Sequence, residues 1–391
     1  MRDHFEQILG LGNATDNPND LFAYSYDASE LSGTCRAVLF PSSDEHLRQI
    51  LTYCGRINVD VVVRGNGSNT SGQTIPANSV VVCTQNLNRI HALNTNEGWV
   101  QVDCGVTIGI LNDALNQHDV VFPLQGASDN LTTIGALLAT NAPSRYSGRY
   151  GLPSERLVEL ECMDGTGKHY TFTRDFEQYC GNEGSVFILI KAKLKTVQRA
   201  ERSASLEYFD KPHQALERSH ALRNDPDIIA VDYFDVAAAT YCGLNTKHTL
   251  FIEHAGGAGT HLHEDYKRLL QKRYQARRLL GAKGHTKRAD GRAHNEQLLD
   301  AIEWCIERDT PVICHLQTGV IHPFFKREKE QLFNDWAEYL AAMGASPVGQ
   351  HGYGLVHKKH VPPGLKTKIR QLKERYDYSN TLGKGKLYDY I

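Results

Sequence analysis

The chain has 391 residues, of which 41% are hydrophobic and 23% are charged, a composition typical of a soluble globular protein. A chain of this length is too long for a single hydrophobic core and long enough for two packed units. The formal net charge is −2 and no basic arm stands out, which excludes nucleic acid as an expected partner. No apolar run approaches the length of a membrane span, and the N-terminus lacks the apolar core of a signal peptide.

Nine cysteines are scattered along the chain without a CxxC pair. Iron–sulfur ligation needs clustered cysteines, so this cofactor is excluded. An odd count without a secretion signal indicates reduced, mostly buried thiols. We therefore expect a cytoplasmic protein, either free or peripheral to the inner face of the membrane.

The first half of the chain predicts alternating short strands and helices. Hydroxyl caps at Ser42 or Ser43 and apolar residues at helical spacing mark the first helix. Strands are predicted at 37–41, 60–64, 79–84, 99–105 and 184–197, and helices at 42–58, 106–119 and 132–142. A hairpin is expected around Asp164 and Gly165.

The second half, from about residue 200, predicts an α+β domain that covers a substrate. Strands are expected at 227–235, 248–256 and 311–315, and helices at 263–281 and 295–309. The helix at 263–281 is strongly basic, and we interpret its charge as a solvated face rather than a binding patch. Two further helices, separated by a loop rich in glycine and histidine, are predicted after residue 326.

The stretch VVVRGNGSNTSGQT (61–74) joins a buried β-branched run to a loop of glycine, hydroxyl and amide residues. Glycine lets a backbone approach a ligand closely, and successive N–H groups with Ser68 and Thr70 can form a nest for an anion. The stretch has neither the GxxxxGK[ST] of a P-loop nor the GxGxxG of a Rossmann helix. By itself the stretch is also compatible with a flexible hairpin turn, which is the less favoured interpretation.

Two later stretches give this loop a context. The loop, FPLQGASDNLTTIGALLATNAPSRYSGRYG (122–151) and YCGNEGSVFILIKAKLKTV (179–197) together resemble the FAD-binding domain of the vanillyl-alcohol-oxidase (PCMH-type) superfamily, in the family's order. The resemblance implies an α+β fold with a two-subdomain FAD-binding domain, an α+β, ferredoxin-like substrate or cap domain, and a C-terminal segment that returns to the flavin. The expected division is 1–34 as an N-terminal segment, 35–200 for FAD, 201–325 for the cap and 326–391 for the C-terminal segment.

The same resemblance implies which residues hold FAD. They are Arg64, Gly65, Asn66, Gly67, Ser68 and Asn69 at the pyrophosphate, Ser128, Thr133, Gly135, Asn141 and Ala142 at the ring, and Glu183, Gly184 and Ile188 at the adenosine end. The loop has no histidine, so FAD is expected to bind without a covalent link through it. Pro143 and Phe187 depart from the family pattern, which often has glycine or serine at the first position and glycine at the second.

Histidines in HLQTGVIH (315–322) and GQHGYG (349–354) resemble those of the glycolate oxidase/D-lactate dehydrogenase branch. In that branch a histidine pair and the glutamate of E-H-G hold a divalent metal. The resemblance implies His351 as the base and His315 and His322, with Gln350, as ligands of Zn, Mn or Fe. Because Gln350 replaces the glutamate and is neutral, we expect weak metal binding. Arg288 and Arg292 are candidates for the substrate carboxylate.

The implied function is oxidation of a small D-2-hydroxy acid of the D-lactate, glycolate or D-2-hydroxyglutarate class to the 2-oxo acid, by hydride transfer to flavin N5. This reaction requires an electron acceptor, and we expect a quinone, a carrier protein or oxygen. A homodimer is a further expectation. Three alternatives stay open at this point: an FAD enzyme for another alcohol or sugar, a catalytically degenerate FAD-binding subunit of a redox complex, and a metal hydrolase that uses the three histidines.

Overall fold

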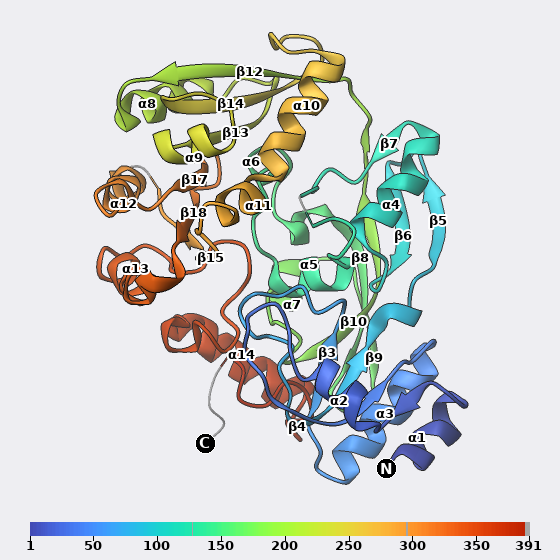
Figure 1. Cartoon of the computed structure of the whole chain (residues 1–391). Helices are drawn as coiled ribbons and strands as arrows, with labels where there is room; N and C mark the ends of the chain where they lie inside the picture. The colour runs from blue at the N-terminus through green and yellow to red at the C-terminus, as the bar shows by residue number, and fades with distance from the viewer. Residues whose placement is uncertain (127, 295, 388–391) are drawn as a thin grey trace.

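The computed structural model describes residues 1–391 apart from 127, 295 and 388–391 (Figure 1). The N-terminal part forms a four-stranded sheet, in which β2, β4 and β3 are parallel and β1 is antiparallel. The strand order is β1 (Ala14–Thr15), β2 (Thr34–Leu39), β4 (Ala77–Cys83) and β3 (Val61–Arg64). The helices of this part are α1 (Arg2–Leu9), α2 (Pro18–Tyr24) and α3 (Asp44–Arg56). The α3 helix starts after Ser43, whose side chain accepts a hydrogen bond from the His46 N–H, as its predicted cap requires.

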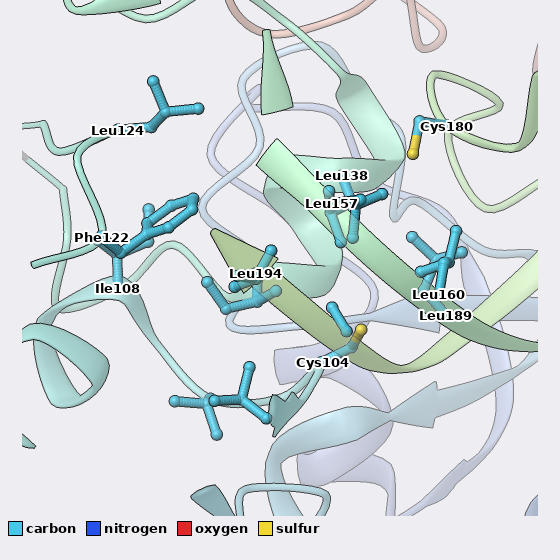
Figure 2. Packing of buried hydrophobic residues seen from close by; sticks show 14 of the residues in the cluster. Cys104, Ile108, Phe122, Leu124, Leu138, Leu157, Leu160, Cys180, Leu189 and Leu194 are labelled. Carbon is cyan, nitrogen blue, oxygen red and sulfur yellow. The ribbon is translucent and has the colours of Figure 1, made fainter. Parts of the chain in front are cut away.

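A second, antiparallel sheet of five strands forms the other half of the predicted FAD-binding region. Its order is β5 (Ile90–Asn94), β6 (Trp99–Asp103), β10 (Phe187–Lys195), β8 (Leu157–Asp164) and β9 (His169–Phe172). Helices α4 (Ile108–Leu115) and α5 (Ile134–Thr140) pack on it through apolar side chains. Figure 2 shows part of this core, where Cys104, Phe122 and Leu138 lie near strand residues such as Leu160 and Leu194. The short elements are β7 (Val120–Val121), α6 (Ser147–Tyr150), α7 (Phe176–Tyr179) and β11 (Val197–Gln198).

The cap is an antiparallel seven-stranded sheet at the top left of Figure 1. Its strands are β12 (Arg202–Phe209), β14 (His248–Ala255), β13 (Ile228–Phe234), β17 (Val312–His315), β18 (Val320–Phe325) and β15 (Lys287–Arg288) in that order, with β16 (Gly291–Arg292) also paired to β18. Its helices are α8 (Pro212–Leu222), α9 (Val236–Tyr241), α10 (His263–Tyr274), α11 (Ala276–Gly281) and α12 (Glu296–Ile306). Residue 295, the first of the predicted helix at 295–309, lies outside the described residues.

The prediction of one continuous helix over 263–281 is wrong, because the structure has two helices there. Gln275, whose ψ of −1° departs from the α-helical value, separates α10 from α11. It lies between two arginines, Arg273 and Arg277, that line a cavity described below.

The C-terminal segment contributes α13 (Glu330–Ala342) and α14 (Pro363–Tyr376) and then returns to the first sheet. The Val61 N–H donates to the Thr381 carbonyl at 2.8 Å, and the Lys384 N–H donates to the Asp60 carboxylate at 2.8 Å. The strand that precedes the glycine-rich loop is therefore fixed by the end of the chain. None of the described helices is long and apolar enough to cross a bilayer.

The predicted α+β class is confirmed by these sheets and helices. All nine cysteines are free, and eight of them are buried. For the folded chain we propose the division stated above, because the cap sheet begins at Arg202 and its last strand ends at Phe325.

Candidate active site

A cavity of about 720 Å³ lies where the two sheets of the first half meet the cap and the C-terminal loop. Such a volume falls in the usual range for sites of cofactors and drug-sized ligands. Most of the residues predicted for the site line it: Gly65, Asn66, Gly67, Ser68, Asn69, Ser128, Thr133, Gly135, Ala142, Glu183, Gly184, Arg288, His315, His322, Gln350 and His351. Segments far apart in the sequence thus meet around one space.

Four predicted residues lie outside this lining. The Arg64 guanidinium turns away to the Tyr26 carbonyl, 2.6 Å from it. Asn141 ends α5 with φ 46°, and its side chain accepts from the Ser154 N–H. Ile188 is buried in β10. Arg292 lies in β16, where its backbone pairs with Ser346.

The glycine-rich loop leaves no room for side chains on the cavity wall. A Cβ on Gly65 would lie 2.8 Å from the Thr133 hydroxyl, a distance that real Cβ atoms do not show. Gly67 has φ +68°, which L-residues rarely adopt. The backbone here is therefore exposed to whatever fills the cavity, as a pyrophosphate nest requires.

The loop is also joined directly to the predicted base. The Asn69 side-chain oxygen accepts from the backbone N–H groups of Ser71 and Gln73, which folds the loop on itself. The amide nitrogens of Asn69 and Gln73 then donate to the His351 carbonyl at 2.9 and 3.1 Å. The backbone of His351 is thus held by the loop predicted to bind the cofactor.

Glu183 holds the same C-terminal loop from the other side. Its carboxylate accepts from the backbone N–H groups of Tyr353 (2.7 Å) and Gly354 (2.9 Å). Burial raises the pKa of Glu183 to about 7, although these hydrogen bonds act in the opposite direction. Glu183, which is predicted at the adenosine end, therefore stabilises the C-terminal loop through two backbone hydrogen bonds.

His315 and Asp232 form one of two buried His–Asp pairs beside the cavity. The His315 Nδ1 lies 2.6 Å from Asp232, which also accepts from Arg145 and Arg273. Burial alone would raise the pKa of Asp232, but the two arginines hold it well below its usual range. Burial lowers the pKa of His315 to about 3, so the pair consists of a carboxylate and a neutral imidazole. An ionised carboxylate only accepts, so Nδ1 carries the proton.

His322 and Asp290 form the second pair, with Nδ1 2.8 Å from the carboxylate. Burial lowers the pKa of His322. Asp290 also accepts from the backbone N–H of Gln350 at 3.1 Å and lies 3.6 Å from His351 Nε2. The His315 and His322 rings are 5.1 Å apart and nearly perpendicular.

His351 faces Arg288 at the same end of the cavity. The Arg288 guanidinium contacts the Nε2 of His351. A guanidinium only donates, so this nitrogen carries a lone pair rather than a proton. Burial lowers the pKa of His351 to about 4, against the opposite influence of Asp290. The ring is therefore neutral near pH 7 and able to accept a proton.

Four arginines that the sequence did not single out also line the cavity: Arg145, Arg273, Arg277 and Arg278. The last three belong to the basic segment interpreted as a solvated face. That interpretation is wrong for Arg273, which is half-buried and paired with Asp232, whereas Arg277 and Arg278 are exposed. Lys267 and Arg268 of the same segment do face solvent. The amphipathic pattern located the helix but gave no sign of the break at Gln275.

The donors predicted for a metal do not fit a divalent ion. The Gln350 side-chain N–H donates to the Pro143 carbonyl at 3.0 Å, and the Arg273 guanidinium lies 3.4 Å from both ring nitrogens of His315. A cation thus already faces the nitrogen that a metal would need. In the part of the chain that is described, the one group of three side chains spaced for metal ligation lies elsewhere, at Asp44, Glu161 and His169. Lys191 contacts two of those three.

We compared the sequence and the fold of the chain with those of known proteins. Residues 35–173 match the profile of a family described as an FAD binding domain. The solved structure of p-cresol methylhydroxylase with bound substrate superposes with a TM-score of 0.75, over 99% of this chain and 96% of that one, at 13% identity. Residues 35–173 are therefore similar to an FAD-binding domain, and the whole chain has the fold of the p-cresol methylhydroxylase structure. The glycine-lined cavity fits the cofactor of this family.

Two similar sequences bear names of enzymes or subunits that act on 2-hydroxy acids. Glycolate oxidase subunit GlcD of Bacillus subtilis is 23% identical, and the match covers 99% of this chain and 96% of that protein. A D-2-hydroxyglutarate dehydrogenase of Pseudomonas putida is 29% identical, but the match covers only 39% of this chain and 16% of that enzyme. The chain thus matches nearly the full length of the first relative and a small part of the second.

Gly65→Ala should weaken FAD binding in this flavoprotein by about tenfold or more, equivalent to about 1.4 kcal/mol. The new methyl group must displace Thr133 or move the loop, because the Cβ would lie 2.8 Å from the threonine hydroxyl. Equilibrium binding to the apoprotein, followed by quenching of flavin fluorescence, measures the change.

Gly364→Ala is the matched control, because a Cβ there meets nothing within 4 Å and the residue lies in α14. Its FAD affinity should equal that of the parent. Equal affinity in Gly65→Ala would contradict the role assigned to the loop.

Proposed function

We propose that the protein oxidises a small D-2-hydroxy acid to the corresponding 2-oxo acid with bound FAD as the oxidant. The observation that carries the proposal is the single cavity lined by both the glycine-rich loop and His351, which two hydrogen bonds join. The matches to a glycolate oxidase subunit and to a D-2-hydroxyglutarate dehydrogenase support the substrate class.

FAD would be held without a covalent link by the backbone of residues 65–69, by Thr133 and Gly135 at the start of α5, and by Glu183 and Gly184. When bound, it supplies the acceptor for the hydride that leaves C2 of the substrate. Its electrons would then pass to oxygen, a quinone or a carrier protein.

His351 takes the hydroxyl proton in this proposal. Its Nε2 carries a lone pair, and its backbone is fixed by Asn69 and Gln73. Arg288 contacts that lone pair. A substrate carboxylate that draws Arg288 to itself would free Nε2 and place the hydroxyl beside it, so binding and activation are coupled.

The two His–Asp pairs shape the remainder of the site. Asp232 and Asp290 contact Nδ1 of His315 and His322 and so fix both rings. The Nε2 of His315 lies 3.4 Å from the Arg273 guanidinium. Asp290 also lies 4.0 Å from the Nε of Arg288 and 3.6 Å from His351. One carboxylate thus orients the proposed carboxylate clamp and the proposed base together.

Anaerobic mixing of the FAD-loaded protein with D-lactate, glycolate and D-2-hydroxyglutarate tests the proposal. At least one of them should bleach the flavin absorbance within seconds to minutes, and L-lactate serves as the stereochemical control. If none of these three acids (D-lactate, glycolate and D-2-hydroxyglutarate) reduces the flavin, the proposed function is wrong.

The replacement of a glutamate by Gln350 favours a second candidate, a catalytically degenerate FAD-binding subunit of a redox complex. This candidate predicts tight FAD binding, no reduction by any hydroxy acid and a partner that co-purifies. The same mixing experiment separates the two, because only the first candidate predicts bleaching.

The pH dependence of flavin reduction should report His351. Because the base must be neutral, the second-order rate constant should stay level from pH 7 to 5 and fall as the pH approaches the value of about 4 to which burial lowers the pKa of His351. Stopped-flow pH jumps measure it. A His351→Gln variant gives the contribution of substrate ionisation alone, and an inflection near pH 6.5 or above would contradict the assignment.

A further inference from the structure

The positive charge that faces the proposed substrate comes from arginine side chains. Arg273, Arg277 and Arg288 all line the histidine end of the cavity. Arg273 is paired with Asp232 at 2.8 Å, and Arg288 has Asp290 at 4.0 Å. Among the described residues Arg277 makes no ion pair. Burial lowers the pKa values of Arg288 and His351, and the positive charge of Arg277 acts on both in the same direction. An anion in the cavity would therefore meet positive charge that no carboxylate neutralises.

The same groups argue against a metal at this end. Two imidazole nitrogens point to the cavity, but the third donor of the histidine–histidine–glutamate pattern is replaced by Gln350, a neutral amide tied to Pro143. Arg273 lies 3.4 Å from the free nitrogen of His315. A divalent ion at that nitrogen would have the Arg273 guanidinium as a neighbour, a poor environment for a dication.

Two features make this end of the cavity more positive. Position 350 has a neutral amide where the resembling branch has a glutamate, and Arg277 contributes positive charge that acts on Arg288. Guanidinium groups can attract a substrate carboxylate without a bound ion. Guanidinium binds carboxylate with two parallel hydrogen bonds, so it can also orient the acid, a task otherwise given to a metal.

We propose that this chain works without a metal, and that Arg288, supported by Arg277, takes the place of the divalent ion in binding and orienting the hydroxy acid. The inference rests on the proposed function. The chemistry balances without an ion: the C2–H bond breaks with its electron pair leaving for the flavin, the hydroxyl proton goes to His351, and C2 and its oxygen form the carbonyl. The arginines bind and orient the substrate through their positive charge and transfer neither a proton nor electrons.

Oxalate, a dicarboxylate with no C–H bond to oxidise, probes this end of the cavity independently of turnover. The FAD-loaded full chain is titrated with oxalate in EDTA, in Mn²⁺ and in Zn²⁺, and binding is followed by the shift of the flavin spectrum. Equal dissociation constants in the three buffers, with less than 0.1 metal ion per flavin by elemental analysis, are expected.

Arg288→Met should weaken oxalate binding by at least about tenfold, a factor that corresponds to the loss of one charged hydrogen-bonded partner. Arg288→Lys should recover part of the affinity, because it retains the charge but not the paired geometry. Arg268→Met is the matched control, since Arg268 lies on the exposed side of α10, paired with Asp265. Circular dichroism and retained FAD show that each variant is folded.

Two results would overturn the proposal: oxalate binding that is lost in EDTA and restored by a metal ion, or unchanged affinity in a folded Arg288→Met variant. Failure of the proposed function looks different. In that case oxalate binds tightly and independently of metal, yet no hydroxy acid reduces the flavin.

Discussion

A His351→Gln variant should bind FAD as the parent does and lose about 10²- to 10⁴-fold in the rate of flavin reduction, the range that a general base contributes. Glutamine retains hydrogen-bonding capacity but cannot take the proton. The backbone carbonyl that Asn69 and Gln73 hold is unaffected by the change, so the loop should keep its shape. Single-turnover reduction by the best hydroxy acid, measured anaerobically in a stopped-flow instrument, gives the ratio.

The control for this variant is His263→Asn. His263 is exposed, with 75% of its side chain accessible, and its φ of 48° is one that asparagine tolerates well. It should reduce flavin at the parental rate. A His351→Gln variant that keeps its rate within threefold would show that another group takes the proton, and His322 would be the next to replace.

The sequence predicted much of the fold because the signals are local. Each predicted strand of the first half has its counterpart, and Ser43 caps α3 as a hydroxyl before an apolar-periodic segment should. The glycine-rich loop follows β3 and precedes β4, in the place that the family resemblance required. These features depend on hydrophobic periodicity, helix caps and turns, each of which involves residues within about fifteen positions of one another in the sequence.

The interactions that organise the site are not local, and this is why the sequence did not predict them. Asp232 and Asp290 look like ordinary strand and loop carboxylates, yet each becomes the buried partner of a histidine that comes from another strand. The contact of Asn69 with His351 joins residues 282 positions apart. Arg273 lies in a segment whose composition suggests solvent exposure, yet it lines the cavity and pairs with Asp232 of a strand 41 positions away in the sequence.

Arg145→Met should lower the free energy of unfolding by about 3–5 kcal/mol, the range found when one member of a buried ionic network is removed. Arg145 follows α5 in the FAD-binding half, yet its guanidinium binds Asp232 on β13 and Glu253 on β14 of the cap. Its side chain is 2% exposed, and the two carboxylates are fully buried. The variant would leave both with less compensating charge in a dry environment, and it would sever a link between the halves that enclose the cavity.

Urea unfolding followed by far-UV circular dichroism, together with limited proteolysis of the cap, measures the effect. Arg174→Met is the matched control, because that arginine is 89% exposed and its contact with Asp175 is a surface pair 3.8 Å long, worth at most about 1 kcal/mol. Arg145→Lys should fall between the two, since it keeps the charge but cannot reach both carboxylates with the same fork. Asp232 retains Arg273 and His315, and Glu253 retains Arg202, so a loss below about 1 kcal/mol would mean that these partners suffice. In that event the cap would be held to the FAD-binding half mainly by its apolar contacts, and Asp232 would serve chiefly to orient His315.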